Sequence, residues 1–192
     1  HPTDAAVLDL IFTYLLPALD DNNAQISNSY IGSLLDRLKL FDPAVARLRA
    51  EVDRRIATEH CPIALNLRAG NLVRNQFSGQ TAEAIRYWEA ALAGQPPIAA
   101  QLAAQLRDGY RELHQLDTAL IHQTALLQIN PWDVNTRIES AALLTELHRD
   151  AEADEAWKAA VQLASASEDQ LRQIADRMVG VRRFAAAIPV YT

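Results

Sequence analysis

Apolar residues recur along the chain at spacings of three and four, which is the period of a helix with one buried face. Leu102, Leu106, Tyr110 and Leu113 follow one another at 4, 4 and 3 positions and share such a face. The same pattern predicts further helices at about 4–16, 28–38, 43–56, 117–130, 138–147, 150–161, 167–178 and 182–191. Polar turns or prolines separate them, so the pattern predicts a series of short amphipathic helices.

Several predicted helices begin with residues that can accept a hydrogen bond from the N–H groups of a first turn. Asp42 precedes Pro43, and Ser167 precedes Gln170 by three positions in the form of a capping box. The other predicted N-caps are Thr3 or Asp4, Ser27 or Asn28, Asp117 and Asp150. These positions set the predicted helix starts.

An internal repeat of about 34 residues runs through the chain from about residue 64. The tripeptide Glu-Leu-His at 112–114 recurs at 146–148. Alanines that open the second helical segments are 35, 34 and 34 positions apart, at Ala84, Ala119, Ala153 and Ala187. Pro97 and Pro131 end two of the units and are also 34 positions apart. Matches of three kinds in one register indicate a repeated unit of two helices.

This unit resembles the tetratricopeptide repeat. Large apolar residues such as Leu106 and Tyr110 anchor its first helix, and small residues stand where the helices would cross. An aromatic residue lies late in the second helix, at Trp88, Trp157 and Tyr191. The resemblance implies an all-α fold, a right-handed superhelical solenoid of antiparallel helix pairs in which alanine lets backbones approach closely.

The resemblance covers residues 62–192, with units at about 64–97, 98–133 and 134–167 and an incomplete one at 168–192. Arg107, Gln123 and Ser165 depart from the family pattern, because a small residue, an aromatic residue and a proline usually stand there; the loop at 75–80 is irregular. Residues 1–61 show no match at this period, and we expect an N-terminal helical cap or a diverged extension of the solenoid. Because the last unit is incomplete, we expect the chain to be part of a longer protein.

Composition and charge narrow the classes of function. With 34 alanines and 26 leucines among 192 residues, an all-β fold is improbable. The net charge is −6 and the basic residues are scattered, which predicts no nucleic-acid partner. The densest basic group, Arg47, Arg49, Arg54 and Arg55, alternates with acidic residues and is predicted to be a solvated helix face. The longest apolar stretch, 5–19, contains Asp9 and Pro17, so no membrane insertion is expected.

Residues that could carry catalysis or hold a metal are sparse. The single cysteine, Cys61, allows no internal disulfide and no Cys-rich zinc site, and we interpret it as an ordinary, partly buried thiol. His114 and His148 each follow a glutamate by two positions, which places the two side chains on different sides of a helix, and both are interpreted as turn residues. No phosphate loop or nucleophile motif is present. We therefore predict no catalytic residue, no metal, no cofactor and no enzyme activity.

The resemblance implies that first helices line a concave surface where peptides bind. Carried over to this sequence, the partner-binding residues are Gln101, Ala104, Gln105, Asp108, Arg111 and Glu112, then Asn135, Ile138, Glu139, Ala142, Thr145 and Glu146, and finally Asp169, Arg172, Gln173 and Asp176. Asn66 and Ala69 are the corresponding candidates in the first unit. The surface is mixed and mildly acidic, which favours a partner with basic or neutral polar groups. Trp132 either packs in the joint between units or is partly exposed as a partner anchor.

Two functions follow from the resemblance. The first is a protein–protein interaction scaffold that binds a peptide or protein on its concave surface. The alternative is the helical-repeat arm of a larger bacterial enzyme, similar to glycosyltransferases or sulfotransferases, whose catalytic domain lies beyond Thr192. Apolar residues of the incomplete last unit also allow self-association through the repeat ends. A cytoplasmic location is favoured, and a periplasmic one stays open.

Overall fold

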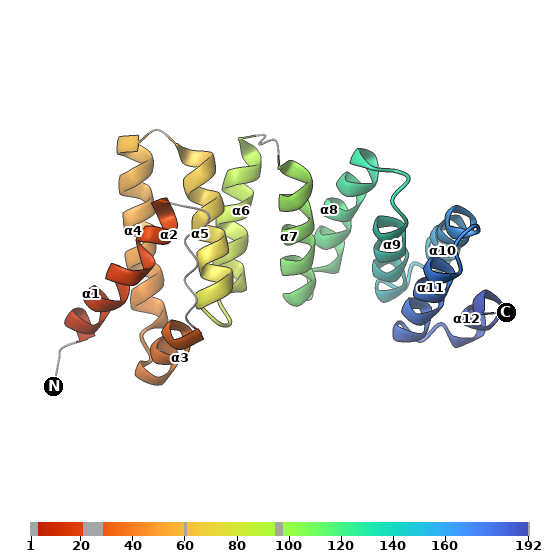
Figure 1. The fold of residues 1–192 in the computed structure, drawn as a ribbon, viewed down its shortest axis with the longest axis horizontal. Coiled ribbons are helices and arrows are strands. Elements are labelled where there is room, and N and C mark those ends of the chain that lie inside the picture. Colours follow the sequence, from red (N-terminus) through yellow and green to blue (C-terminus); the bar gives the residue numbers. More distant parts are fainter. Residues whose placement is uncertain (1–3, 21–28, 60, 95–97, 192) are drawn as a thin grey trace. The chain divides into compact units, whose positions relative to one another are not determined.

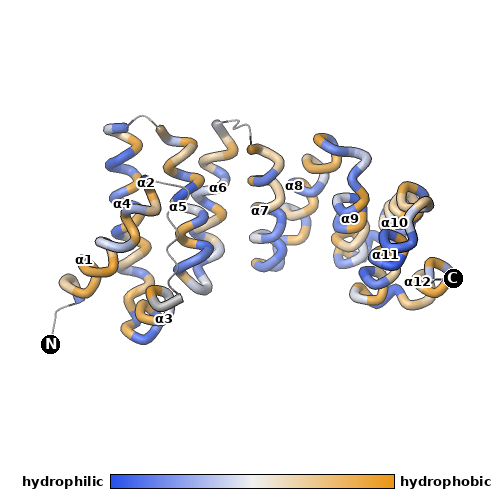
Figure 2. Tube along the Cα trace, viewed as in Figure 1, coloured by the Kyte–Doolittle hydropathy of each residue, from blue (hydrophilic) through white to orange (hydrophobic). Residues whose placement is uncertain are grey.

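All regular elements in the described part of the chain are α-helices, as predicted (Figure 1). The structure, a computed structural model, describes residues 4–20, 29–59, 61–94 and 98–191. Packing divides it into two compact units, His1–Leu102 and Ala103–Thr192. The proposed caps Thr3, Ser27 and Asn28 and the exit residue Pro97 lie outside the described residues. Along the helices, apolar segments recur between polar ones, as the burial of one helix face requires (Figure 2).

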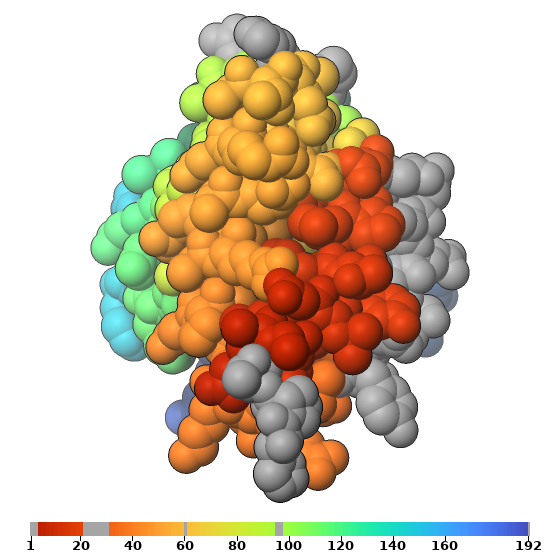
Figure 3. Space-filling view, turned by 90° about the vertical axis from the view of Figure 1, so that its left-hand side faces the viewer, coloured from red at the N-terminus to blue at the C-terminus, as the bar shows by residue number. Residues whose placement is uncertain are grey.

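Unit 1 contains α1 (Asp4–Leu15), α2 (Pro17–Asp20), α3 (Ser29–Leu38), α4 (Phe41–Glu59), α5 (Pro62–Gln76) and α6 (Thr81–Ala93). α5 and α6 form an antiparallel hairpin, and α2, α3 and α4 all pack against α5. α1 lies across α4, as Figure 3 shows. The two helices are in contact, because the guanidinium of Arg47 on α4 lies 4.6 Å from the centre of the Phe12 ring on α1. The helices before Pro62 therefore cover the first helix of the following pair.

Unit 2 is built from α7 (Ala99–Glu112), whose first residues belong to unit 1, and from α8 (Leu116–Ile129), α9 (Val134–Glu146), α10 (Asp150–Ala164), α11 (Glu168–Gly180) and α12 (Phe184–Tyr191). α9 pairs with α10, and α11 pairs with α12. Their shared core includes Ile138, Trp157, Ile174 and Met178. The four repeated alanines, at 84, 119, 153 and 187, are all buried, as expected where helices cross closely.

The turns inside the helix pairs share one backbone geometry. His114, His148 and Arg182 have φ values of 57°, 58° and 63°, so each adopts the left-handed conformation. The next residue donates its N–H five positions back, for example Arg149 to the Leu144 carbonyl at 2.9 Å. This is the Schellman ending of a helix. It makes Gln115 and Arg149 the N-cap residues of α8 and α10, so the predicted caps Asp117 and Asp150 are wrong. The predicted cap at Ser167 is confirmed.

The α3–α4 hairpin carries the same turn, although its sequence shows no match to the repeat. Lys39 has a φ of 55°, Leu40 donates to the Leu35 carbonyl at 2.9 Å, and the buried Ala44 follows Lys39 by five positions. In the later pairs the buried alanine also follows the left-handed residue by five. α4 has 19 residues, whereas α6, α8 and α10 have 13 to 15, and the extra length breaks the 34-residue period. The α3–α4 turn thus has the backbone geometry of the turns inside the repeat pairs.

Replacing His148 with glycine is expected to stabilise the protein by about 0.5–1 kcal/mol, because glycine adopts the left-handed conformation without steric cost. The His148 side chain is exposed, so little packing is lost. Urea unfolding followed by circular dichroism measures the change. Gly79→Ala is the matched control of opposite sign: the residue has a φ of 77° and open space around its Cβ position. A destabilised His148→Gly variant would contradict the interpretation.

The arginine group on α4 is only partly a solvated face. Arg54 and Arg55 do pair with Glu51 on the same helix, as predicted, and the hydrogen bond from Arg54 is the main cause that lowers the pKa of Glu51 to about 2. Arg55 is buried, however, and pairs with Asp20. Arg47 reaches Asp9 on α1, and Arg49 reaches Glu83 on α6 at 2.7 Å. Three of the four arginines therefore pair with residues of other helices and connect α4 to α1, α2 and α6.

The two departures from the family pattern in the α7–α8 pair are bonded to each other. Arg107 Nη1 donates to Gln123 Oε1 at 3.0 Å, and Gln123 Nε2 donates to the backbone carbonyl of Thr136 on α9. Gln123 is completely buried. In the α9–α10 pair the corresponding residues are Ala141 and Trp157, a small and a large side chain that both belong to the core of unit 2. A polar pair thus replaces a small–aromatic pair at one place in the array.

Candidate interaction surface

Polar side chains on the first helices of unit 2 are bonded to one another across helices. Arg111 on α7 donates to two glutamates of α9: its Nη1 lies 3.2 Å from Glu139 Oε2, and its Nε lies 3.1 Å from Glu146 Oε2. Arg177 on α11 holds the same Glu139 carboxylate, with distances of 3.1 and 3.0 Å. Glu139 therefore accepts hydrogen bonds from guanidinium groups on both neighbouring first helices.

A neutral pair extends this arrangement. Gln173 Nε2 on α11 donates to Asn135 Oδ1 on α9 at 2.8 Å. We call these six residues, Arg111, Asn135, Glu139, Glu146, Gln173 and Arg177, the polar ladder. The charged side chains of the ladder are 27–28% exposed. Two arginines balance two glutamates there, so the ladder is electrically neutral and its side chains are held in defined positions.

The predicted partner-binding residues divide into three groups in the structure. Exposed residues are Gln101, Asp108, Glu112, Asn135, Asp169, Arg172, Gln173 and Asp176. Half-buried residues are Ala104, Gln105, Arg111, Glu139, Thr145 and Glu146. Ile138 and Ala142 are buried in the core, with Ile138 only 2% exposed, so their prediction as surface residues is wrong. The same holds for Asn66 and Ala69 in α5. α9 contacts α8, α10 and α11, so it buries a wider arc than a simple amphipathic helix does.

Some of the exposed residues already have intramolecular partners. Asp108 pairs with the adjacent Arg107 at 2.8 Å, and Asp176 accepts a hydrogen bond from the Tyr191 hydroxyl. That hydrogen bond is the main cause that raises the pKa of Tyr191. Thr145 turns away from the surface, because its hydroxyl accepts from Trp157 Nε1 at 3.2 Å. Asp169 and Arg172 are exposed on α11 and add charges of opposite sign beside the ladder.

Sequence reasoning missed Arg177. A signal for it exists in the spacing: Asn135 and Gln173, and likewise Glu139 and Arg177, are 38 positions apart, which is one repeat plus one helical turn. Complementary residues at this spacing lie opposite one another on successive first helices. The repeat period alone predicts which helix face a residue occupies, whereas this longer spacing predicts its cross-helix neighbour.

Trp132 is exposed and does not pack in the joint between units, and its role as a partner anchor stays a prediction. Its side chain is 75% exposed in the α8–α9 turn. Asp133 accepts a hydrogen bond from the Thr136 N–H at 2.8 Å and caps α9, which fixes the turn that presents the indole. Ile129, at the end of α8, is also exposed. A large aromatic side chain on a fixed turn is the kind of residue that anchors partners.

The remaining sequence predictions concern metal binding, membrane crossing, Cys61 and the two turn histidines. Among residues 4–20, 29–59, 61–94 and 98–191, no group of three or more His, Cys, Asp or Glu side chains could hold a metal ion. No helix of this part of the chain has the length and apolar character needed to cross a membrane. Cys61 is exposed, so its predicted partial burial is wrong. His114 and His148 are exposed turn residues, as predicted.

No protein-family model and no curated protein matches the sequence. Solved structures do match. MamA AMB-1 is 19% identical, with 95% of this chain and 88% of that chain covered and a TM-score of 0.55. YrrB, described as a TPR protein with an unusual peptide-binding site, is 18% identical, with 92% and 88% covered and a TM-score of 0.55. At this identity the likeness establishes the fold, which is that of tetratricopeptide-repeat solenoids.

Proposed function

We propose that the chain is a protein-interaction scaffold that binds a peptide segment of a partner along α7, α9 and α11. The observation that carries the proposal is the polar ladder. Its side chains take no part in the apolar core, yet cross-helix hydrogen bonds hold them in place on three successive first helices. Polar groups that are ordered before binding lose little conformational entropy when a partner contacts them.

The charges around the ladder set the partner's chemistry. The ladder itself is neutral, so its exposed neighbours decide the sign of the surface. Asp108, Glu112, Asp169 and Asp176 are acidic and Arg172 is basic. A peptide with basic and neutral polar side chains is the complementary partner, since charge complementarity steers association and excludes acidic competitors. YrrB, which shares the fold, is described as binding peptide, and this supports the same use of the helices here.

A peptide-display selection against the purified chain tests the proposal. We expect basic, polar peptides to be enriched, and a variant with Asp108→Lys and Asp169→Lys to bind them about tenfold or more weakly in fluorescence anisotropy. Both residues are exposed, so the fold is retained. Arg111 and Glu139 are poorer choices, because their substitution also disturbs the ladder.

Glu155→Lys on α10 is the matched control, since Glu155 is a highly exposed acidic residue on a second helix. We expect this variant to bind the selected peptides like the wild type. Equal binding by the Asp108/Asp169 variant would overturn the proposed surface. Loss of binding in Trp132→Ala alone would move the site to the α8–α9 turn.

We also propose that the repeat units run as predicted from the sequence, with the helices before Pro62 extending the array. The described helix pairs support this: α5–α6, α7–α8, α9–α10 and α11–α12 fall in the four predicted units. The enzyme-arm alternative stays a prediction, and the sequence of the parent gene beyond Thr192 tests it.

A further inference from the structure

A polar cavity of about 490 Å³ lies in unit 1, between α3 and the C-terminal end of α5. Figure 1 shows α3 beside this end of α5. The volume is within the range of about 300–1,000 Å³ that is usual for ligand sites. The polar residues that line the cavity are Ser33, Asp36, Asn75, Gln76 and Ser78. Among the described residues Asp36 is the one charged member of this lining, so the cavity has a negative character.

Asp36 has the same place in its hairpin as Arg111 of the polar ladder. Each stands on the first helix of a hairpin, three positions before a left-handed residue, which is Lys39 after Asp36 and His114 after Arg111. Arg111 pairs across helices with two glutamates of α9. No cationic side chain in the described parts of the chain pairs with Asp36 in this way. The Asp36 carboxylate therefore brings an unmatched charge to the cavity.

The basic side chains nearest to Asp36 in the fold do not line this cavity. Arg37 follows Asp36 on α3 but lines a separate hollow against α1. Arg74 on α5 donates to the Thr81 hydroxyl on α6 at 3.3 Å. Lys39 is exposed in the turn after α3 and is not part of the cavity wall. The negative charge of the cavity is thus left for a cation from outside the chain.

The end of α5 adds hydrogen-bond acceptors to the same wall. The last carbonyl groups of a helix have no partners within the helix and carry partial negative charge. Gly32 lets α3 approach this end closely, because a Cβ atom there would lie 2.7 Å from the Gln76 carbonyl oxygen. Asn75 and Gln76 contribute amide side chains. A cation with several N–H donors fits this set of acceptors better than one with a single charge centre.

Phe41 gives the cavity an aromatic wall. The Phe41 ring is held by edge-to-face contact with the buried Phe77, with ring centres 6.3 Å apart and planes at 75°. A guanidinium group stacks on such rings and is more weakly hydrated than an ammonium group. The chain itself uses this pairing, since the Arg86 guanidinium lies 4.2 Å from the centre of the Tyr87 ring.

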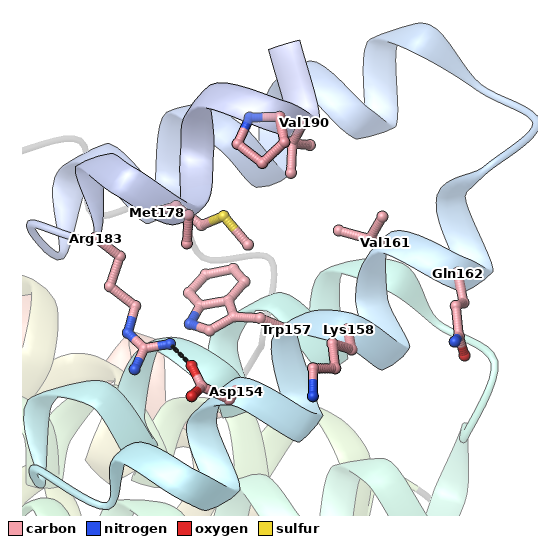
Figure 4. Close-up of a pocket in the computed structure, with 10 residues that line it drawn as sticks. Asp154, Trp157, Lys158, Val161, Gln162, Met178, Arg183 and Val190 are labelled. Atoms are coloured by element: carbon pink, nitrogen blue, oxygen red, sulfur yellow. Dashed lines mark hydrogen bonds and ion pairs between the residues drawn. The ribbon is translucent and has the colours of Figure 1, made fainter. Parts of the chain in front are cut away.

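A cavity of equal volume in unit 2 shows that size alone does not create a cation site. This second cavity, also about 490 Å³, lies between α10 and α12 (Figure 4). Its charged groups are already paired: Arg183 pairs with Asp154, and Lys158 pairs with Glu155 at 2.7 Å. The rest of its lining is largely apolar and includes Trp157. The unmatched carboxylate distinguishes the cavity between α3 and α5.

We propose that the cavity between α3 and α5 binds an arginine side chain of a partner peptide. The guanidinium pairs with the Asp36 carboxylate and lies on the Phe41 ring, and its remaining N–H groups donate to the acceptors at the end of α5. This site is in unit 1, so it is a binding site additional to the surface along α7, α9 and α11.

Titration of the isotope-labelled chain with N-acetyl-arginine amide, followed by NMR, tests the proposal. We expect the amide signals of Ser33, Asn75 and Ser78 to shift until they saturate. The expected dissociation constant is about 1–10 mM, because a single side chain makes few contacts. N-acetyl-lysine amide should bind about threefold more weakly or less tightly still. The neutral N-acetyl-glutamine amide should leave these signals in place.

Two variants and a matched control locate the binding. Asp36→Asn should weaken binding of the arginine probe about tenfold, and the exposed position of Asp36 lets the fold persist. Phe41→Leu keeps an apolar wall but removes the ring, so it should weaken binding about threefold. Asp53→Asn is the control, because Asp53 is an exposed aspartate on α4 outside the cavity. This variant should bind the probe like the wild type.

Four outcomes would overturn the proposal: no saturable shift, unchanged affinity of Asp36→Asn, equal weakening by Asp53→Asn, or equal affinity for the lysine probe. The variant with Asp108→Lys and Asp169→Lys should bind the arginine probe like the wild type, because both residues belong to unit 2. Failure of the proposed surface in unit 2 and failure of this cavity are therefore distinguishable.

Discussion

Replacing Gly70 with alanine is expected to destabilise the protein by about 2 kcal/mol, although alanine is the better helix former. A Cβ atom at this position of α5 would lie 2.5 Å from Trp88 Cδ1 and 2.6 Å from Nε1, with the Ala84 carbonyl oxygen at 3.2 Å. Overpacking of this kind costs about 3 kcal/mol, and helix propensity returns about 1 kcal/mol. The clash therefore outweighs the gain.

The Trp88 side chain is held in place by burial and by a hydrogen bond. It is buried, and its indole Nε1 donates to Asn71 Oδ1 at 3.1 Å, which fixes the ring. Urea unfolding measures the loss. Gly180→Ala is the control, because its nearest neighbour would be 3.9 Å away and the variant should be neutral or slightly more stable. Equal stabilities of the two variants would show that Trp88 does not pack on Gly70.

The helical architecture follows from the sequence because two independent signals agree. The apolar spacing predicts helices, and the alanines at the repeat period predict where they cross, which the burial of all four alanines bears out. The α3–α4 hairpin escaped this logic because the longer α4 shifts the period. The predicted caps Asp117 and Asp150 were wrong because the left-handed residue in the preceding turn lets the next helix begin earlier in the sequence, with Gln115 and Arg149 as N-caps.

The candidate surface could be predicted only as a set of helix faces. Sequence periodicity places Arg111 and Glu139 on first helices, but their contact depends on how those helices are offset along each other. Ile138 was misplaced for a related reason: the arc that α9 buries depends on how many helices pack on it. The sequence left the burial of Trp132 open, because a turn residue is not part of a helical pattern that would indicate whether its side chain is buried or exposed.

Replacing Gln123 with phenylalanine is expected to cost about 3 kcal/mol, while adding Arg107→Ala to the same chain should recover most of that loss. Gln123 is completely buried and accepts a hydrogen bond from Arg107 Nη1 at 3.0 Å. Phenylalanine alone removes the acceptor of Arg107 Nη1 and crowds the arginine, which then keeps only its pair with Asp108. A donor left without an acceptor in a mostly buried place is costly.

The double variant recreates the small–aromatic combination that Ala141 and Trp157 form in the next helix pair. The Thr136 carbonyl loses its side-chain donor but keeps its place in the backbone of α9. Arg107→Ala alone is expected to cost about 1 kcal/mol, since it leaves the buried glutamine without its donor and removes packed methylene groups.

Urea unfolding of the two single variants and the double variant gives the coupling energy, which we expect to be about 2–3 kcal/mol. The control cycle pairs Gln123→Phe with Arg172→Ala, an exposed arginine on α11, and should be additive within about 0.5 kcal/mol. Additivity of the Arg107 and Gln123 effects would mean that the two departures from the repeat pattern arose independently. Strong coupling would mean that they form one unit, because each is tolerated only where the other supplies its hydrogen-bond partner.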